Sequence, residues 1–237
     1  MKKLQNFLKS YPKSRILDIG TGTGTFIKTI ISLDDNYLEI IGIDVLENAI
    51  SASTKNFEGN KRIHFEKMDA LHLTFEEHSF DIVCLSNSLH HLEDIGKTIK
   101  EMERMLKPNG ALLFNEMISN GLSNAQISHK FLHHFAAEID RENGLIHYDT
   151  FDGSKILSLL KKHSTLSVQE NWVMLYERQE HNSKEEIDFL FQTMDRLIEK
   201  VKSEKKVKYF TRKAEDIKKY ISKYGFDSAT QKLFVLK

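Results

Sequence analysis

One stretch near the start of the chain constrains its fold more than any other: an apolar run that leads into three alternating glycines. Residues 16–26 read ILDIGTGTGTF, and residues 25–33 carry apolar side chains at helical spacing. Glycine adopts positive φ angles and has no Cβ, so such a loop lets a ligand lie against bare main chain. In doubly wound sheets, ligands bind at the carboxyl ends of the strands. The stretch therefore predicts a first strand, a ligand-binding loop and a helix.

The rest of the chain continues this alternation of short apolar runs and helical patterns. Further strands are predicted over residues 38–43, 63–68, 80–85, 111–114, 165–176 and 231–236. Helices are predicted over residues 1–12, 46–56, 92–106, 154–162, 183–201 and 211–223, and the sequence KPNG at 107–110 is predicted to separate a helix from the fifth strand. Strands that alternate with helices indicate right-handed βαβ units. We therefore predict an α/β fold with a doubly wound, mostly parallel seven-stranded sheet, in a single domain over residues 1–237.

Two segments, 118–150 and 183–224, are predicted as helical insertions after the fifth and sixth strands. The second opens with Ser183-Lys184-Glu185-Glu186, which is typical of a capping box. An apolar stripe then runs from Ile187 to Val201 and suits either a core or a homodimer interface. We expect these insertions to form a lid over the substrate, with the dimer interface as the alternative.

Composition excludes several classes of protein. With 34 Lys+Arg, 34 Asp+Glu and 40 % hydrophobic residues, the chain has a formal net charge of zero and enough apolar surface to exclude global disorder. The single cysteine, Cys84, excludes a disulfide scaffold and a cysteine-rich zinc site. No apolar run approaches the roughly 18 residues of a membrane-spanning helix. Polar residues interrupt the N-terminus, so we expect no secretory signal, no membrane partner and a cytoplasmic location.

The spacing of the glycines excludes two common nucleotide-binding loops. The third glycine of a dinucleotide fingerprint would stand at position 25 or 27, where the chain has Thr25 and Ile27. The Gly-Lys-Ser/Thr of a triphosphate-binding loop is also absent. A nicotinamide dehydrogenase is therefore disfavoured.

The pattern that remains, D-x-G-x-G-x-G, resembles the first motif of the class I S-adenosylmethionine-dependent methyltransferases. Four further stretches match that family in order: GIDV at 42–45, MDA at 68–70, FDIVCLSNSLHHL at 80–92 and LKPNGAL at 106–112. The resemblance extends from about Ile16 to Met117. It implies a Rossmann-like methyltransferase fold, S-adenosyl-L-methionine as cofactor, S-adenosyl-L-homocysteine as product, and methyl transfer to a small-molecule acceptor.

The same resemblance implies a set of cofactor-binding residues. They are Asp18, Gly20, Thr21, Gly22, Gly24, Asp44, Val45, Asp69, Ala70, Ser86 and Asn87. A carboxylate at the end of the second strand, Asp44, can accept hydrogen bonds from both ribose hydroxyls. The family implies that Asp69 and Ala70 contact adenine, and that Ser86 and Asn87 lie beside the methionine part.

Methyl transfer by in-line displacement mainly requires alignment of the acceptor, and a base only where the acceptor carries a proton of high pKa. The candidates for catalytic roles are His90, His91 and Glu116, with Asn115 positioning the substrate. Packing at a helix start is an equally open interpretation of the two histidines.

Four histidines, His129, His133, His134 and His147, suggest a metal site at first sight. His129 and His133 have the i, i+4 spacing of a zinc pair, but Lys130 stands where the H-E-x-x-H motif has glutamate. We therefore expect no metal.

The segment 200–223 holds ten Lys/Arg and three acidic residues, a local net charge of +7. Such a strip can bind phosphates, so an RNA-directed methyltransferase is an alternative function. The neutral whole-chain charge favours a solvated helix face and argues against a nucleic-acid partner. A non-catalytic protein that binds S-adenosylmethionine is a further alternative.

Overall fold

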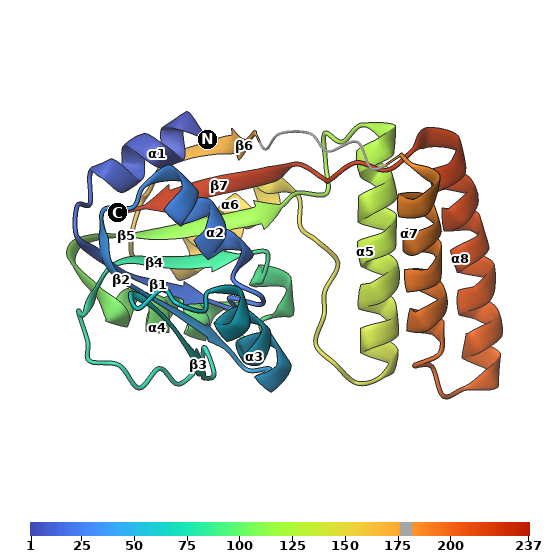
Figure 1. Ribbon diagram of the computed structural model, residues 1–237, viewed down its shortest axis with the longest axis horizontal. Coiled ribbons are helices and arrows are strands. Elements are labelled where there is room, and N and C mark those ends of the chain that lie inside the picture. Colours follow the sequence, from blue (N-terminus) through green and yellow to red (C-terminus); the bar gives the residue numbers. More distant parts are fainter. Residues whose placement is uncertain (176–181) are drawn as a thin grey trace. The chain divides into compact units, whose positions relative to one another are not determined.

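The computed structural model describes residues 1–175 and 182–237 (Figure 1). Its strands are β1 (Ser14–Ile19), β2 (Tyr37–Asp44), β3 (Ile63–Lys67), β4 (Phe80–Ser86), β5 (Leu106–Met117), β6 (Val168–Met174) and β7 (Gln231–Leu236). Its helices are α1 (Lys2–Lys9), α2 (Thr25–Leu33), α3 (Glu47–Asn56), the 3-10 helix η1 (Leu89–His91), α4 (Ile95–Met105), α5 (Asn124–Glu142), α6 (Gly153–His163), α7 (Lys184–Ile198) and α8 (Glu204–Tyr224).

The chain divides into two compact units. The first unit comprises Met1–Glu116, Ser154–Met174 and Lys232–Lys237, and the second comprises Met117–Gly153 and Leu175–Gln231. Each unit has a hydrophobic cluster of its own. The prediction of one domain over residues 1–237 stays a prediction.

A seven-stranded sheet of order β3-β2-β1-β4-β5-β7-β6 forms the centre of the first unit. The pairs among β3, β2, β1, β4 and β5 are parallel. β7 runs antiparallel to its neighbours. Ser167, just before β6, and Lys237, just after β7, each donate a backbone hydrogen bond to the other, which is the pattern of an antiparallel pair. The predicted doubly wound, mostly parallel sheet is confirmed, and its strand order reverses at β1, beside β4.

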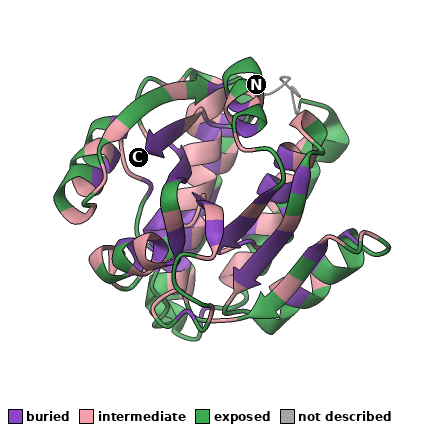
Figure 2. Ribbon diagram, turned by 90° about the vertical axis from the view of Figure 1, so that its left-hand side faces the viewer, coloured by how far each residue is buried: buried purple, intermediate pink, exposed green. Residues whose placement is uncertain are grey.

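Helices cover both faces of this sheet. Figure 1 shows α1, α2 and α3 over one face and α4 and α6 over the other. Alternate strand residues such as Ile16, Ile82 and Leu113 share one cluster with Leu4 of α1 and Ile30 of α2. The alternation follows from the two-residue period of a strand. Figure 2 shows the strands as largely buried, while the helices expose their outer sides.

Several boundaries differ from the sequence prediction, and those of β5, α8 and β6 are the most informative. β5 begins at Leu106, because Leu106 pairs with Phe80 before the register resumes at Ala111 with Ile82. The predicted break at 107–110 is therefore a bulge within β5. α8 begins at Glu204, earlier than predicted, because its lysines obscure the apolar spacing of its first turns. β6 ends at Met174, and the predicted strand end at position 176 lies outside the described residues.

The second unit brings the two predicted insertions together. α5 comes from the first insertion, α7 and α8 come from the second, and the three helices share one apolar cluster around Phe135, Met194 and Phe210. The stripe from Ile187 to Val201 packs against this cluster, so it serves a core. The predicted capping box at Ser183 is confirmed. Among the described helices, each lacks the length or the apolar character needed to cross a membrane.

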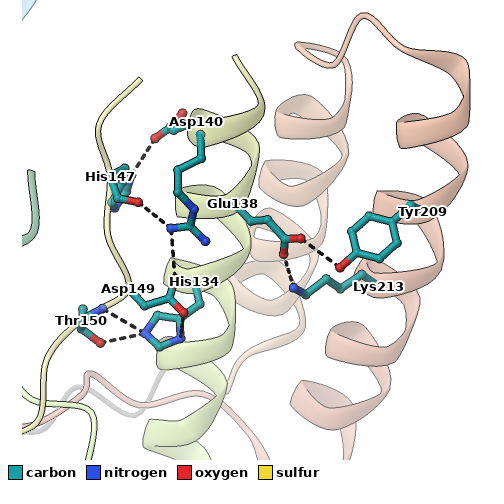
Figure 3. A network of polar contacts seen from close by, with 9 residues as sticks. His134, Glu138, Asp140, His147, Asp149, Thr150, Tyr209 and Lys213 are labelled. Atoms are coloured by element: carbon teal, nitrogen blue, oxygen red, sulfur yellow. Dashed lines mark hydrogen bonds and ion pairs between the residues drawn. The ribbon is translucent and has the colours of Figure 1, made fainter. Parts of the chain in front are cut away.

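Polar contacts add to the packing of the second unit (Figure 3). Glu138 of α5 accepts hydrogen bonds from Tyr209, at 2.9 Å, and from Lys213, both on α8. The segment after α5 is attached to that helix through His147, whose Nδ1 lies 2.7 Å from Asp140, and through His134, whose Nε2 accepts from the Thr150 amide at 3.2 Å. These contacts attach α5 to α8 and to the segment that follows α5.

Because the second unit has its own core, Phe210→Ala should destabilise it selectively. Phe210 is buried and packs edge-to-face on Phe135, with ring centroids 5.8 Å apart. We expect a loss of about 3–5 kcal/mol in the free energy of unfolding of this unit. Urea titrations followed by far-UV circular dichroism would report the helices, and fluorescence of Trp172, the only tryptophan, would report the first unit.

The matched control is Phe189→Ala in α7, where the side chain is 59 % exposed and the expected loss is below about 1 kcal/mol. If Phe210→Ala shifted the urea midpoint equally by circular dichroism and by Trp172 fluorescence, the second core would not be independent. That result would favour the single-domain prediction.

Candidate functional site

The predicted cofactor residues collect at one edge of the sheet in the first unit. Parallel strands end at the same edge, and β3, β2, β1, β4 and β5 are neighbours in that order. The register places Asp44 opposite Lys67 and Ser86 opposite Asn115. The glycine loop lies between them, after β1.

The glycine loop has a backbone that other residues rarely adopt. Gly20, Gly22 and Gly24 have φ angles of +65°, +54° and +81°. A Cβ on Gly24 would lie 2.4 Å from the Phe57 ring, whereas a Cβ on Gly22 would meet no atom within 4 Å. The main chain at Gly22 therefore faces open space, as the main chain of a ligand-binding loop must.

Asp44 is bound to this loop. Its Oδ2 accepts a hydrogen bond from the Gly22 amide at 3.0 Å, and its Oδ1 accepts from the Leu46 amide at 3.0 Å. Each carboxylate oxygen can accept a second hydrogen bond. Asp44 is therefore held with remaining acceptor capacity beside Gly22, an arrangement that fits a ribose. Val45, next to it, is 55 % exposed.

Asp69 and Ala70 follow β3 at the same edge. The Met68 amide donates to the Asp44 carbonyl at 3.0 Å, which links the ends of β2 and β3. Asp69 is exposed, and its Oδ1 accepts from the Leu71 amide at 2.9 Å. The predicted adenine contacts of Asp69 and Ala70 stay predictions.

Asp18, in β1, and Thr21, within the glycine loop, are both buried. Asp18 is 1 % exposed, and its Oδ2 accepts from the Thr21 hydroxyl at 2.8 Å. Burial raises the pKa of Asp18 to about 7; the Thr21 hydrogen bond opposes this rise, and the charge of Asp44 adds to it. Both residues thus support the loop from the protein interior.

The end of β4 is linked to the glycine loop through Ser88, a residue for which the sequence predicted no role. Its hydroxyl lies 3.1 Å from the Gly20 carbonyl and 2.9 Å from the Ser86 carbonyl. Asn87, which precedes it, has a φ angle of +49°. The sequence could not reveal this link, because Ser88 and Gly20 are far apart in the chain and meet only where the ends of β1 and β4 lie side by side.

The catalytic candidates are near one another. His90 and Glu116 are both buried, and His90 Nδ1 lies 3.5 Å from Glu116 Oε2. His91 is exposed, and its ring centroid lies 4.5 Å from that of His90. Asn115 donates to the Ser86 hydroxyl at 3.0 Å. The packing interpretation therefore suits His90, and the exposed position suits His91 for contact with an acceptor.

The histidines of α5 do not form the pair that their spacing suggests. His129 Nδ1 accepts from the Ala229 amide at 2.9 Å, and its ring lies 5.3 Å from that of Phe226. His129 thus helps attach the segment before β7 to α5. His133 lies instead beside His147, with ring centroids 5.0 Å apart.

The raised pKa of Asp18 predicts a pH-dependent stability. Its folded-state pKa of about 7 exceeds the ordinary value of 3.8, so the folded protein keeps a proton that the unfolded chain releases. The free energy of unfolding should therefore fall as pH rises from about 4 to 7, by on the order of 4 kcal/mol. Asp18→Asn, which cannot ionise, should abolish this contribution. Urea titrations at pH 4.5 and 7.5 would measure it.

The control for that experiment is Asp69→Asn, at an exposed position of the same edge, which should keep the wild-type pH dependence. An equal pH dependence for wild type and Asp18→Asn would refute the assignment.

Comparisons with known proteins agree with this geometry. Residues 17–114 match the family model described as a methyltransferase domain. Demethylmenaquinone methyltransferase of Bacteroides fragilis is 31 % identical over 120 residues, 49 % of this chain and 48 % of that protein. Phosphoethanolamine N-methyltransferase of Plasmodium falciparum is 25 % identical over 240 residues, 97 % of this chain and 83 % of that protein.

The structural comparison shows the same fold over nearly the whole chain. The solved structure of YjhP from E. coli matches with a TM-score of 0.60 and 18 % identity, over 99 % of this chain and 90 % of that one. Several curated relatives are much longer than the matched region: the chain spans about half of the B. fragilis enzyme and 4 % of a highly reducing polyketide synthase of Pyrenophora dematioidea. Residues 17–114 therefore form a methyltransferase domain, and the strand order and the glycine loop agree with the fold of the class I S-adenosylmethionine-dependent methyltransferases.

Proposed function

We propose that this protein transfers a methyl group from S-adenosyl-L-methionine to a small-molecule acceptor. The observation that carries the proposal is Gly22, whose main chain faces open space while its amide is bound to the Asp44 carboxylate. The names of the relatives, a demethylmenaquinone and a phosphoethanolamine methyltransferase, support an acceptor of low molecular weight.

Several residues of the first unit would bind the cofactor. Asp44 would accept hydrogen bonds from the ribose hydroxyls, and Asp69 and Ala70 would contact adenine. Ser86 and Asn87, at the end of β4, would lie beside the methionine part. When bound, S-adenosylmethionine supplies a methyl group on a positively charged sulfur. The main task of the protein is then alignment, which contributes roughly 7–11 kcal/mol in well-oriented reactions.

The acceptor side is proposed to involve the segment after β4. The exposed His91 can contact an acceptor and take its proton, whereas His90 is buried. The segments 118–150 and 183–224 are proposed to shape the acceptor pocket as a lid, with a dimer interface as the alternative. A cytoplasmic location stays a prediction.

The RNA-directed alternative gains little support from the basic segment. Lys206, Lys213 and Lys218 are engaged in ion pairs with Glu142, Glu138 and Asp195 of the neighbouring helices. These ion pairs lower the excess of positive charge available to phosphates. Cys84 is buried within β4, and burial raises the pKa of its thiol well above the ordinary value, which disfavours covalent attack on a base.

Gly22→Ala tests the cofactor site. A methyl group at position 22 meets no protein atom, so the fold should survive, but it occupies the space at the loop and strains a positive φ angle. We expect the affinity for S-adenosylhomocysteine to fall at least about tenfold, or about 1.4 kcal/mol. Isothermal titration calorimetry would measure this affinity. In the same experiment, NAD should not bind to the wild-type protein.

Gly59→Ala is the matched control, since Gly59 also has a positive φ, +89°, and no atom within 4 Å of an added Cβ. Gly59 precedes β3, at the opposite end of that strand from Asp69, so Gly59→Ala should bind S-adenosylhomocysteine like wild type. Equal affinity of Gly22→Ala and Gly59→Ala would refute the proposed site.

Methyl transfer can be tested directly with S-adenosylmethionine labelled on its methyl group and a cell extract. We expect protein-dependent label in the low-molecular-weight fraction, and loss of that label with Gly22→Ala. Label that enters only ribonuclease-sensitive material would favour the RNA-directed alternative. Binding of S-adenosylhomocysteine without any transfer of label would favour a non-catalytic protein.

A further inference from the structure

We propose that Glu116 is a positioning residue: its buried carboxylate orders residues 87–89 and sets the tautomer of His90. The catalytic meaning of this inference rests on the proposed function, but the tautomer is a property of the protein alone. The contacts of Glu116 favour this role over that of the base suggested by the sequence.

Glu116 lies near the end of β5 and is 2 % exposed. Its Oε1 accepts hydrogen bonds from the amides of Ser88, at 3.0 Å, and Leu89, at 3.1 Å. A carboxylate oxygen has two lone pairs, so both are used. Both lone pairs of Glu116 Oε1 thus accept hydrogen bonds from the backbone of the segment that follows β4.

The neighbouring amide is bound to β5 as well. Asn87 N donates to the Asn115 carbonyl at 2.8 Å. Three consecutive amides, those of residues 87, 88 and 89, are therefore bound to Asn115 and Glu116. Asn87 has a positive φ angle, +49°, a conformation that persists where surrounding contacts hold it. The two β5 residues supply those contacts.

The order imposed by Glu116 reaches the glycine loop through Ser88. The Ser88 hydroxyl lies 3.1 Å from the Gly20 carbonyl, and a Cβ on Gly20 would lie 2.5 Å from that hydroxyl oxygen. The positions of Ser88 and Gly20 are therefore interdependent. A change at Glu116 that releases Ser88 should alter the cofactor loop.

The second carboxylate oxygen faces His90. Oε2 lies 3.5 Å from Nδ1, and both side chains are 2 % exposed. An anionic oxygen at this position favours a proton on Nδ1, which leaves Nε2 as the basic nitrogen of the ring. Glu116 thereby determines which nitrogen of His90 can accept a proton.

Glu116→Gln separates this effect from loop order. Gln has nearly the same size as Glu, and its side-chain oxygen can still accept hydrogen bonds from the backbone amides of Ser88 and Leu89. Its amide nitrogen would then face His90 and donate to Nδ1, so the proton of the imidazole should move to Nε2. Two-bond ¹H–¹⁵N NMR correlations of the full-length, ¹⁵N-labelled protein at alkaline pH identify the tautomer. His90→Gln assigns the signals.

We expect the Nδ1–H tautomer of His90 in wild type and the Nε2–H tautomer in Glu116→Gln. The control is Glu103→Gln, because Glu103 accepts from Ser164 and Thr165 instead and should leave His90 unchanged. An Nε2–H tautomer in wild type, or the same tautomer in wild type and Glu116→Gln, would overturn the inference.

Ligand binding provides the functional readout. Glu116→Gln should bind S-adenosylhomocysteine within about threefold of wild type, whereas Glu116→Ala, which leaves two amides without their acceptor, should bind about tenfold more weakly or worse. A wild-type protein that fails to bind S-adenosylhomocysteine would refute the proposed function and leave the tautomer result standing.

Discussion

The hydrogen bond between the Gly22 amide and the Asp44 carboxylate is the contact on which the site depends. It joins the loop after β1 to the end of β2, and the Thr21 amide, which donates to the Ile43 carbonyl at 2.9 Å, adds a second link. Both links require the parallel register that pairs Ile19 with Ile43. The glycine loop therefore takes its shape from the sheet.

Several polar side chains of the first unit are buried where its strands end. Asp18, His90, Asn115 and Glu116 are all buried at this edge of the first unit. Burial of such groups is costly unless hydrogen bonds compensate, and a buried acid responds by a raised pKa, as Asp18 does. The hydrogen bonds of these buried side chains run to the segments that follow β1 and β4 and hold those segments in place.

Much of this architecture could be predicted from the sequence because its signals are local. β1, α2 and β7 follow from apolar spacing, and the loop follows from three alternating glycines. The bulge at 107–110 could not be predicted, because it depends on the pairing of Leu106 with Phe80 across the sheet. The partners of Glu116 could not be predicted either, since the amides of Ser88 and Leu89 come from a different strand end.

Spacing along the chain encodes strands, helices and glycine loops, so the fold class, the resemblance to the methyltransferases and the glycine loop could all be read from the sequence. The three-dimensional fold brings two insertions that are distant in the sequence into one core around Phe135 and Phe210. It also decided that Glu116 faces backbone amides and that Ser88 contacts Gly20. These contacts join distant residues, and local propensity carries no information about which strand ends will meet.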